Sequence, residues 1–360
     1  MKICFLAPAN SAHTKKWCGY FVSQGHEVHV VSFYDEKIDG VQLHYINTGA
    51  NANGGDGQKL KYLLKAGAVR KVVKKIAPDV VNVHYATSYG TVAALSGLKN
   101  YILSIWGSDI FEFPQKSPLH RLLLKFSLAR AKYLFSTSKA MAEEAGKYTK
   151  KAFEITPFGV NMDLFTPDKR NDNHSDFVIG TVKSLAPAYA IDLLLKAAAL
   201  VKKEQPHIPL KVRIAGNGPC QQAYQQLATQ LGIDSISHWL GFIPQEQAAV
   251  EWANMDVAVI CSNNESFGVS AVEAQSCGCP VIISDIPGLM EATNPGVTSI
   301  VVPRQDERAL ADALVALYHD EALREQMGAA GRAYVAENYE LNLCFQNIFS
   351  LFQRFADAPR

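Results

Sequence analysis

Residues 256–285 read DVAVICSNNESFGVSAVEAQSCGCPVIISD, and this stretch decides how the second half of the chain should fold. Its two apolar, β-branched runs, 257–261 and 281–283, are short and continuous, as are strands buried on both faces of a parallel sheet. A polar loop, a helical segment and a glycine turn separate the two runs. The stretch therefore predicts a βαβ unit in a parallel α/β sheet.

The junction between the polar loop and the helix carries candidate chemistry. Phe267, Gly268 and Val269 stand where the helix should begin, so their backbone N–H groups and the helix dipole could hold a phosphate. Glu265 precedes them and Glu273 follows them, so both carboxylates could accept hydrogen bonds from ligand hydroxyls. This combination indicates a nucleotide sugar. The alternative is that both are solvated carboxylates, which the start of a helix favours.

The segment ESFGVSAVE, residues 265–273, resembles the Glu-x7-Glu motif of retaining glycosyltransferases of family 4, which have two Rossmann-like domains in the GT-B fold. The resemblance implies that Glu265 contacts the donor hexose and Glu273 the ribose hydroxyls, with Ser266 and the helix start also on the donor. It covers nearly the whole chain. Further matching pieces are 274–281, 287–291, 296–298, 301–303 and 327–332.

The length of 360 residues exceeds what one hydrophobic core usually holds, which predicts two domains. We expect an acceptor-side domain at 1–165, completed by a C-terminal helix at 343–360, and a donor-binding domain at 166–342. The polar tract 167–176 is the expected linker. The fold class expected from the resemblance is α/β, with two Rossmann-like domains facing each other across a cleft.

Charge is distributed unevenly between the two halves. Residues 1–165 contain 21 Lys and Arg against 12 Asp and Glu, whereas the remainder contains 14 against 22. The basic segments, 59–75 and 116–151, carry no recognised nucleic-acid-binding motif, which argues against nucleic-acid binding. They could meet an anionic membrane surface, or they could simply be solvated faces of charge-rich helices.

No apolar run approaches 18 residues, and the N-terminal apolar stretch is too short for a signal peptide. We therefore expect a cytoplasmic protein, either free or peripheral at the inner membrane face. The seven cysteines suit reduced thiols in that compartment. Cys277 and Cys279 lack a second Cys or His pair at zinc spacing, which argues against a zinc site there. The resemblance to GT-B enzymes, which generally work without a metal ion, implies no metal and no cofactor, and the sequence has no compelling DxD-type site.

The opening segment, 2–33, reads as a βαβ unit without G-x-G-x-x-G, which argues against a dinucleotide pyrophosphate there. Asn10, Ser11 and His13 follow its first strand and could form a polar acceptor-side mouth. Asn10 and Ser11 could equally be helix caps. His84 follows the strand at 79–83 and is a further acceptor-side candidate, because ligands bind at the carboxyl ends of parallel strands.

The turn at 107–109 follows the strand 101–106 and resembles the His-Gly-x-Asp turn of the family, with Trp106 where many members have His. The difference puts in doubt any hydrogen bond from that His to the sugar and leaves Asp109 as the catalytic candidate. The alternative is that Asp109 caps the next helix.

A long amphipathic helix is expected at 59–76, with Leu63, Leu64 and Ala68 on its apolar face and most of its lysines elsewhere. The preceding segment, 47–58, is rich in Gly and Asn and predicts a mobile loop.

The segment KSLAPAYAID, 183–192, departs from the Arg-Leu-x-x-x-Lys-Gly pattern of the family, whose two cations neutralise the donor diphosphate. Lys183 remains, while Tyr189 and Ala190 stand at the Lys-Gly positions. One cation is therefore missing unless another Arg or Lys replaces it, and Lys183 could also be an ordinary surface residue. The family holds the base mostly through backbone groups, which suggests three further donor-binding residues: Gly216, Gly218 and Phe242.

These residues together suggest a retaining glycosyltransferase that moves a hexose from a nucleoside-diphosphate sugar, a UDP-sugar being favoured, to a lipid-linked or envelope-polysaccharide acceptor. The helix start and Lys183 would stabilise the departing phosphate. A phosphate oxygen could take the acceptor proton, so no protein base is required. Glu265 could instead be a nucleophile, although its expected place beside the sugar disfavours this. The alternatives are a nucleotide-sugar epimerase of the same fold and a non-catalytic nucleotide-sugar-binding protein.

Overall fold

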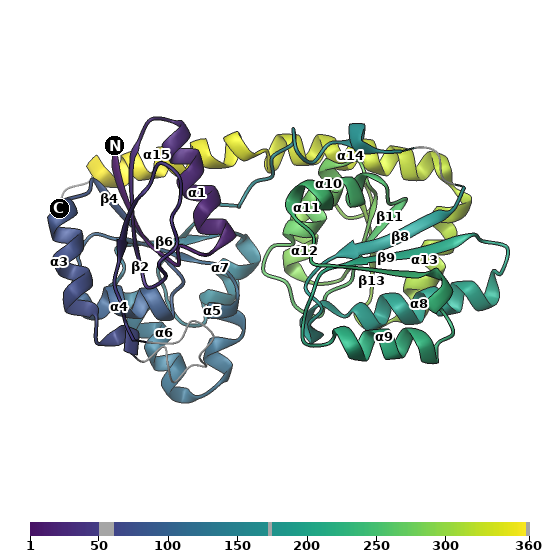
Figure 1. The fold of residues 1–360 in the computed structure, drawn as a ribbon, viewed down its shortest axis with the longest axis horizontal. Coiled ribbons are helices and arrows are strands. Elements are labelled where there is room, and N and C mark those ends of the chain that lie inside the picture. The colour runs from purple at the N-terminus through teal and green to yellow at the C-terminus, as the bar shows by residue number, and fades with distance from the viewer. Residues whose placement is uncertain (50–60, 172–174, 358–360) are drawn as a thin grey trace. The chain divides into compact units, whose positions relative to one another are not determined.

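The computed structural model describes residues 1–49, 61–171 and 175–357, which form two compact units. The first unit contains Met1–Phe158 with Phe345–Arg360, and the second contains Gly159–Cys344. The division therefore falls between Phe158 and Gly159, where the sequence placed it between 165 and 166. Each unit has its own parallel sheet (Figure 1).

The first unit has a seven-stranded sheet in the order β3-β2-β1-β4-β5-β6-β7, with every pairing parallel. Its strands are β1 (Lys2–Leu6), β2 (Glu27–Ser32), β3 (Gln42–Tyr45), β4 (Val80–His84), β5 (Ile102–Ile105), β6 (Tyr133–Ser136) and β7 (Phe153–Ile155). Its helices are α1 (Ala12–Ser23), α3 (Ala66–Ile76), α4 (Ser88–Ser96), α5 (Ser108–Phe111), α6 (Pro118–Arg130), α7 (Lys139–Ala145) and the greater part of α15 (Leu341–Asp357).

Helices cover both faces of this sheet (Figure 1). On one face α1 and α15 enclose an aromatic layer, in which the rings of Phe21 and Phe352 stack 5.4 Å apart and Trp17 meets Phe345 edge-on at 5.7 Å. On the other face a core joins the buried sides of α3, α4 and α6. The C-terminal helix thus returns to the first unit, and its aromatic residues explain why.

The second unit has a six-stranded parallel sheet in the order β10-β9-β8-β11-β12-β13. Its strands are β8 (Phe177–Val182), β9 (Leu210–Ala215), β10 (Ser237–Gly241), β11 (Val257–Ile260), β12 (Val281–Ser284) and β13 (Ser299–Val302). Its helices are α8 (Ile191–Glu204), α9 (Gln221–Gln230), α10 (Gln245–Ala253), α11 (Val269–Ser276), α12 (Pro287–Ala292), α13 (Glu307–His319) and α14 (Glu321–Asn338).

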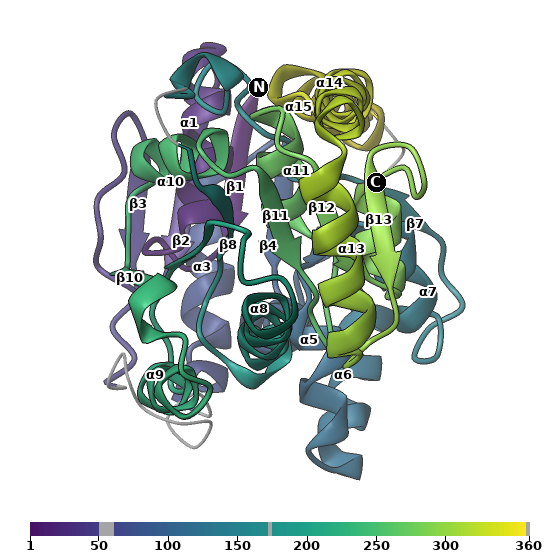
Figure 2. The ribbon, with the colours of Figure 1, turned by 90° about the vertical axis from the view of Figure 1, so that its right-hand side faces the viewer.

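Two hydrophobic cores sandwich the second sheet. One joins it to α8, α9 and α13, and the other joins it to α10 and α11. In Figure 2, α8 is seen nearly end-on and α13 from the side. The expected βαβ unit at 256–285 is present as β11, α11 and β12, whose strands are buried throughout. The prediction of an α/β fold with two Rossmann-like domains is confirmed.

The strand orders create one switch point in each sheet. In the first sheet the chain winds outward in opposite directions from β1 and β4, and in the second from β8 and β11. Loops that leave the carboxyl ends of such neighbouring strands diverge, which opens a crevice where ligands bind in α/β proteins. The loops after β8 and β11 carry Lys183 and Glu265, and those after β1 and β4 carry Asn10 and Tyr85.

The predicted helix at 59–76 is wrong in its phase. Helix α3 begins only at Ala66, after a turn at 64–65. Because the turn resets the helical phase, Val69 and Val73 face the core, whereas Leu64 is 84% exposed. Residues 50–58 of the predicted mobile loop lie outside the described residues.

Within the described ranges, no helix combines the length and the apolar character needed to cross a bilayer.

Candidate functional site

Lys183 and Glu265, predicted from separate motifs, meet at the switch point of the second sheet. Lys183 directly follows β8, Glu265 lies in the loop after β11, and Lys183 Nζ donates to Glu265 Oε2 at 2.5 Å. The hydroxyl of Ser262 also approaches Oε2, at 3.5 Å. Both charged side chains are only 11% exposed. A charge-assisted hydrogen bond in such surroundings is strong, and losing one partner would leave a poorly solvated charge.

The loop that carries Glu265 is fastened to the turn that follows Lys183. The backbone N–H of Asn263 donates to the carbonyl of Ala188 at 2.8 Å, and its side-chain amide donates to the carbonyl of Pro187 at 3.1 Å. Movement of one loop would therefore disturb the other, so these bonds fix where Glu265 stands relative to Lys183.

Tyr189 and Ala190 explain how this chain departs from the Lys-Gly pattern. The ammonium of Lys183 lies 4.6 Å from the ring centre of Tyr189, a cation–π contact. Ala190 has φ of 46°, the left-handed conformation that glycine adopts without strain. The turn thus keeps the backbone that Gly would favour, and an aromatic ring that contacts Lys183 stands where the family has a cation.

Two glycines let neighbouring loops approach these residues. A Cβ on Gly216, whose φ is 132°, would lie 1.9 Å from the carbonyl oxygen of Lys183. A Cβ on Gly288 would lie 2.3 Å from the carbonyl oxygen of Glu265. A Cβ on Gly218 would likewise lie 2.3 Å from the carbonyl oxygen of Leu185. Larger residues at these positions would push the loops apart, so these glycines are needed for the site's geometry.

The start of α11 lies beside Lys183. Gly268 is the N-cap residue, with φ of 95°, and the hydroxyl of Ser270 donates to the carbonyl of Val182 at 3.2 Å. The first N–H groups of a helix have no partner within the helix and carry its positive dipole end. With the ammonium of Lys183 nearby, these N–H groups form a candidate anion site. The side chain of Phe267 is buried in the core, so its backbone alone could contribute.

The remaining donor-side candidates lie on the same edge of the sheet or on α11. Ser266 is partly buried directly before Phe267. Phe242 follows β10 and is 77% exposed, and the neighbouring Gly241 carbonyl accepts from the Gly216 N–H at 2.6 Å.

Glu273 lies in the second turn of α11 and is partly buried. Burial raises the pKa of the Cys277 thiol to about 12, and the negative charge of Glu273 contributes to this rise. Its assignment to ribose stays a prediction.

In the first unit the predicted polar mouth is partly aromatic. Asn10 is exposed, whereas Ser11 occupies the N-cap position of α1 without a side-chain capping bond and instead hydrogen-bonds Tyr85. The ring of His13 stacks on Phe158 at 4.1 Å. Burial, and then the charge of Lys16, lower the pKa of His13 to about 4. His13 is therefore neutral at pH 7.

His84 is fully buried rather than exposed at this mouth. Its ring centre lies 4.1 Å from that of Trp106 and 5.2 Å from that of Trp17. Burial, followed by the charge of His13, keeps the pKa of His84 well below its usual value. Among the described residues, neither ring nitrogen of His84 nor the Trp106 indole N–H has a hydrogen-bond partner. Contact between His84 and an acceptor would require this aromatic cluster to open.

Asp109 joins two turns of the first sheet. Its carboxylate accepts hydrogen bonds from the backbone N–H groups of Ala86, Trp106 and Gly107 at 2.9, 3.1 and 2.9 Å. Burial raises the pKa of Asp109, and these donors oppose that rise. The side chain therefore holds the turns after β4 and β5 together, which is more than the capping of one helix. Its catalytic assignment stays a prediction.

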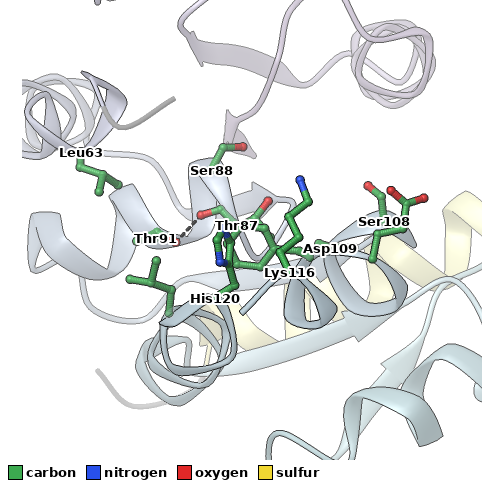
Figure 3. A pocket seen from close by; sticks show the side chains of 11 residues that line it. Leu63, Thr87, Ser88, Thr91, Ser108, Asp109, Lys116 and His120 are labelled. Atoms are coloured by element: carbon green, nitrogen blue, oxygen red, sulfur yellow. Dashed lines mark hydrogen bonds between the residues drawn. The ribbon is translucent and has the colours of Figure 1, made fainter. Parts of the chain in front are cut away.

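A cavity of about 200 Å³ opens beside Asp109 (Figure 3). Hydroxyl groups from the turns after β4 and β5 and from α4 face it, together with Lys116, which precedes α6, and His120 of α6. The hydroxyl residues follow parallel strands and could have been suspected from the sequence, but nothing local indicates that Lys116 and His120 join them. The lining residues are Leu63, Thr87, Ser88, Thr91, Ser108, Asp109, Glu112, Phe113, Lys116, His120 and Leu123.

No group of three or more His, Cys, Asp or Glu side chains within the described ranges is arranged to hold a metal ion. Ser262, Ser270 and Tyr189 support Lys183 or Glu265 but were not identified from the sequence. Ser262 lies just before the motif and Ser270 lies within it, and their hydroxyls were the available signal.

Asp109→Ala should lower the free energy of unfolding by about 2–4 kcal/mol, because three backbone N–H groups lose their acceptor and two of them lie in tight turns. Asp79→Ala is the control, since that exposed carboxylate accepts one backbone hydrogen bond, from Lys2. Urea denaturation measures both. Equal, small losses would contradict the bridging role of Asp109.

Gly216→Ala should destabilise the second unit by more than the roughly 1–2 kcal/mol expected for a left-handed alanine alone, because its Cβ would collide with the Lys183 carbonyl. Gly232→Ala is the matched control, with φ of 68° and no atom within 4 Å of the added Cβ. Thermal unfolding compares the two variants. If Gly216→Ala costs no more than Gly232→Ala, the close approach at Lys183 is not a constraint.

Comparison with known proteins covers both units. Residues 2–138 match the family model "Glycosyl transferase 4-like", and residues 164–334 match "Glycosyl transferases group 1". A D-inositol 3-phosphate glycosyltransferase of Kribbella flavida is 32% identical over 191 residues, covering 49% of this chain and 45% of that relative. The chain spans about half the length of the curated relatives it matches.

Solved structures share the fold over the whole chain. Sucrose-phosphate synthase from Thermosynechococcus elongatus has a TM-score of 0.88 at 18% identity, with each chain covered completely. HepE from Anabaena, solved in complex with UDP-glucose, has a TM-score of 0.78 at 18% identity, with 98% of this chain and all of that chain covered. With the model "Glycosyl transferase 4-like" matched on the first unit, "Glycosyl transferases group 1" on the second and this fold throughout, the chain belongs to the glycosyltransferases with the GT-B fold.

Proposed function

We propose that this protein transfers a hexose, with retention of configuration, from a nucleoside-diphosphate sugar to an acceptor hydroxyl. The observation that carries the proposal is the Lys183–Glu265 pair beside the start of α11. A cation and a helix N-terminus suit a diphosphate, and a carboxylate suits sugar hydroxyls. That HepE was solved with UDP-glucose supports a UDP-sugar as the donor.

Donor binding would exchange the partners of the ion pair. The diphosphate would take the ammonium of Lys183, and a hydroxyl of the hexose would donate to Glu265. In the reaction the bond between the anomeric carbon and the phosphate oxygen breaks, and a bond to the acceptor oxygen forms on the same face. The acceptor proton passes to a phosphate oxygen of the leaving group. Lys183 and the first N–H groups of α11 stabilise the charge that develops there, without a metal ion.

The nucleoside would lie over the loops after β9 and β10. The exposed ring of Phe242 offers a stacking surface for the base, and the loop of Gly216 and Gly218 offers backbone groups. Glu273 would accept from the ribose hydroxyls.

Two other functions fit the same donor site: a nucleotide-sugar epimerase and a non-catalytic nucleotide-sugar-binding protein. Incubation with a panel of nucleotide sugars and a membrane extract separates the three. The proposed function gives a glycosylated product, whereas an altered nucleotide sugar or binding alone would indicate one of the alternatives.

For the acceptor we propose a lipid-linked or envelope-polysaccharide glycan, used by a cytoplasmic enzyme that is peripheral to the inner membrane face. The excess of basic residues in 1–165 supports this acceptor. A small phosphorylated polyol is the second candidate. The name of the inositol-phosphate relatives and the cavity with Lys116, His120 and several hydroxyl groups favour it.

Lys183→Ala should weaken UDP binding about tenfold or more, because the diphosphate loses a charged hydrogen bond worth roughly 1.5–3 kcal/mol.

Glu265→Ala should leave UDP affinity unchanged or slightly higher, since it frees Lys183, but should lower turnover with a UDP-sugar about a hundredfold or more. Glu273→Ala should weaken UDP binding by about 1–3 kcal/mol.

Isothermal titration with UDP measures affinity, and product formation measures turnover. Lys211→Ala is the control, because that lysine pairs with Asp176 at the amino-terminal end of the same sheet. Unchanged UDP affinity in Lys183→Ala would remove this cation from the site. An equal loss of affinity and turnover in Glu265→Ala would reassign that carboxylate to the nucleotide.

A further inference from the structure

Helix α6, Pro118–Arg130, has leucines on two opposite sides. Leu124 and Leu128 are fully buried in the core of the first unit. Leu119 and Leu122 are 62% and 64% exposed. A surface helix normally has one apolar side, which packs inward, and a polar side toward water. The outer leucines of α6 therefore require another explanation.

The outer apolar residues form a continuous stripe. Positions 119, 122, 126 and 129 recur at the three- and four-residue spacing that places side chains along one side of a helix. Phe126 is partly buried, and Ala129 is exposed. Counted around the helix, the stripe lies opposite the side that carries Leu124 and Leu128.

Cations border this stripe. Lys125 and Arg130 are exposed and flank it on either side, and the guanidinium of Arg130 lies 5.4 Å from the ring centre of Phe126. Residues 113–142 contain six Lys and Arg and no Asp or Glu. An apolar stripe bordered by cations is complementary to a surface that is apolar inside and anionic outside.

Helix α3 has the charge without the stripe. Lys71, Lys74 and Lys75 are exposed, but the large apolar residues of α3, such as Val69 and Val73, face the core. Cations alone are attracted to an anionic surface, whereas a helix that lies in a bilayer interface also buries apolar side chains there. Helix α6 meets both requirements.

We infer that α6 is the segment through which the protein rests on an anionic lipid bilayer. Leu119, Leu122 and Phe126 enter the interface, and Lys125 and Arg130 meet lipid phosphates. This inference rests on the proposed function, from which it takes the lipid-linked acceptor. It adds the surface of the protein that contacts the bilayer. Lys116 and His120 line the cavity next to α6, so the head group of a lipid-linked acceptor could enter the cavity while its chain stays in the bilayer.

The test is co-sedimentation of the full chain with vesicles of phosphatidylcholine alone or mixed with phosphatidylglycerol. The chain should bind the mixed vesicles, and salt should weaken the binding. Leu119→Ser/Leu122→Ser should lower the partition coefficient on the order of tenfold or more. Lys125→Gln/Arg130→Gln should lower it about fivefold for each cation.

Two matched controls separate the alternatives. Val250→Ser removes an exposed apolar side chain from α10 of the second unit and should leave binding unchanged. Replacing Lys71, Lys74 and Lys75 with Gln should also lower vesicle binding. The loss per cation removed should be smaller than for Lys125→Gln/Arg130→Gln. The melting temperature of each variant confirms that it is folded, because all the substituted side chains are exposed.

Three results would overturn the inference: no binding to mixed vesicles, binding that survives the leucine substitutions but is lost with the α3 lysines, or self-association without lipid that the leucine substitutions abolish. The last would identify α6 as a contact between copies of the chain. UDP titration of the same samples keeps the two proposals apart. Wild-type protein that binds UDP but not vesicles contradicts only the membrane surface, whereas failure to bind UDP contradicts the donor site.

Discussion

The ion pair between Lys183 and Glu265 is the interaction on which the donor-side geometry depends. The two residues come from strands on either side of the switch point, so their contact requires the strand order of the second sheet. Both side chains are largely removed from water, and a diphosphate sugar could give each a new partner. The pair therefore suits the resting state of a donor site, because it gives each buried charge a partner until a ligand binds.

Much of this arrangement could be predicted from the sequence because its signals are local. The apolar runs and glycine turn of 256–285 specify β11, α11 and β12, and Lys183 and Glu265 each stand directly after or near a strand end. The parallel sheet then brings them to one edge. The break at 64–65, by contrast, contains neither Gly nor Pro, so nothing local predicted that Leu64 would be exposed.

Other features depend on tertiary contacts that no local pattern encodes. His84 is the last residue of β4, at the sheet edge where ligands bind, yet Trp17 and Trp106 enclose it. The ring of Tyr189 lies against Lys183, although the sequence suggested only that a cation was missing there. Asp109 was expected near a ligand, and the structure directs its carboxylate at three backbone N–H groups. The rings around His84 and the Ala86 N–H on Asp109 come from distant segments, whereas the contact of Tyr189 with Lys183 depends on the course of the turn between them.

A crystal structure of the chain with UDP-glucose bound tests the central claim most directly. We predict that a diphosphate oxygen lies within hydrogen-bond distance of Lys183 Nζ and of the first N–H groups of α11, while Glu265 accepts from a glucose hydroxyl. The 2.5 Å contact between Lys183 and Glu265 should then lengthen or break. A nucleotide bound elsewhere, with that contact intact, would contradict the account.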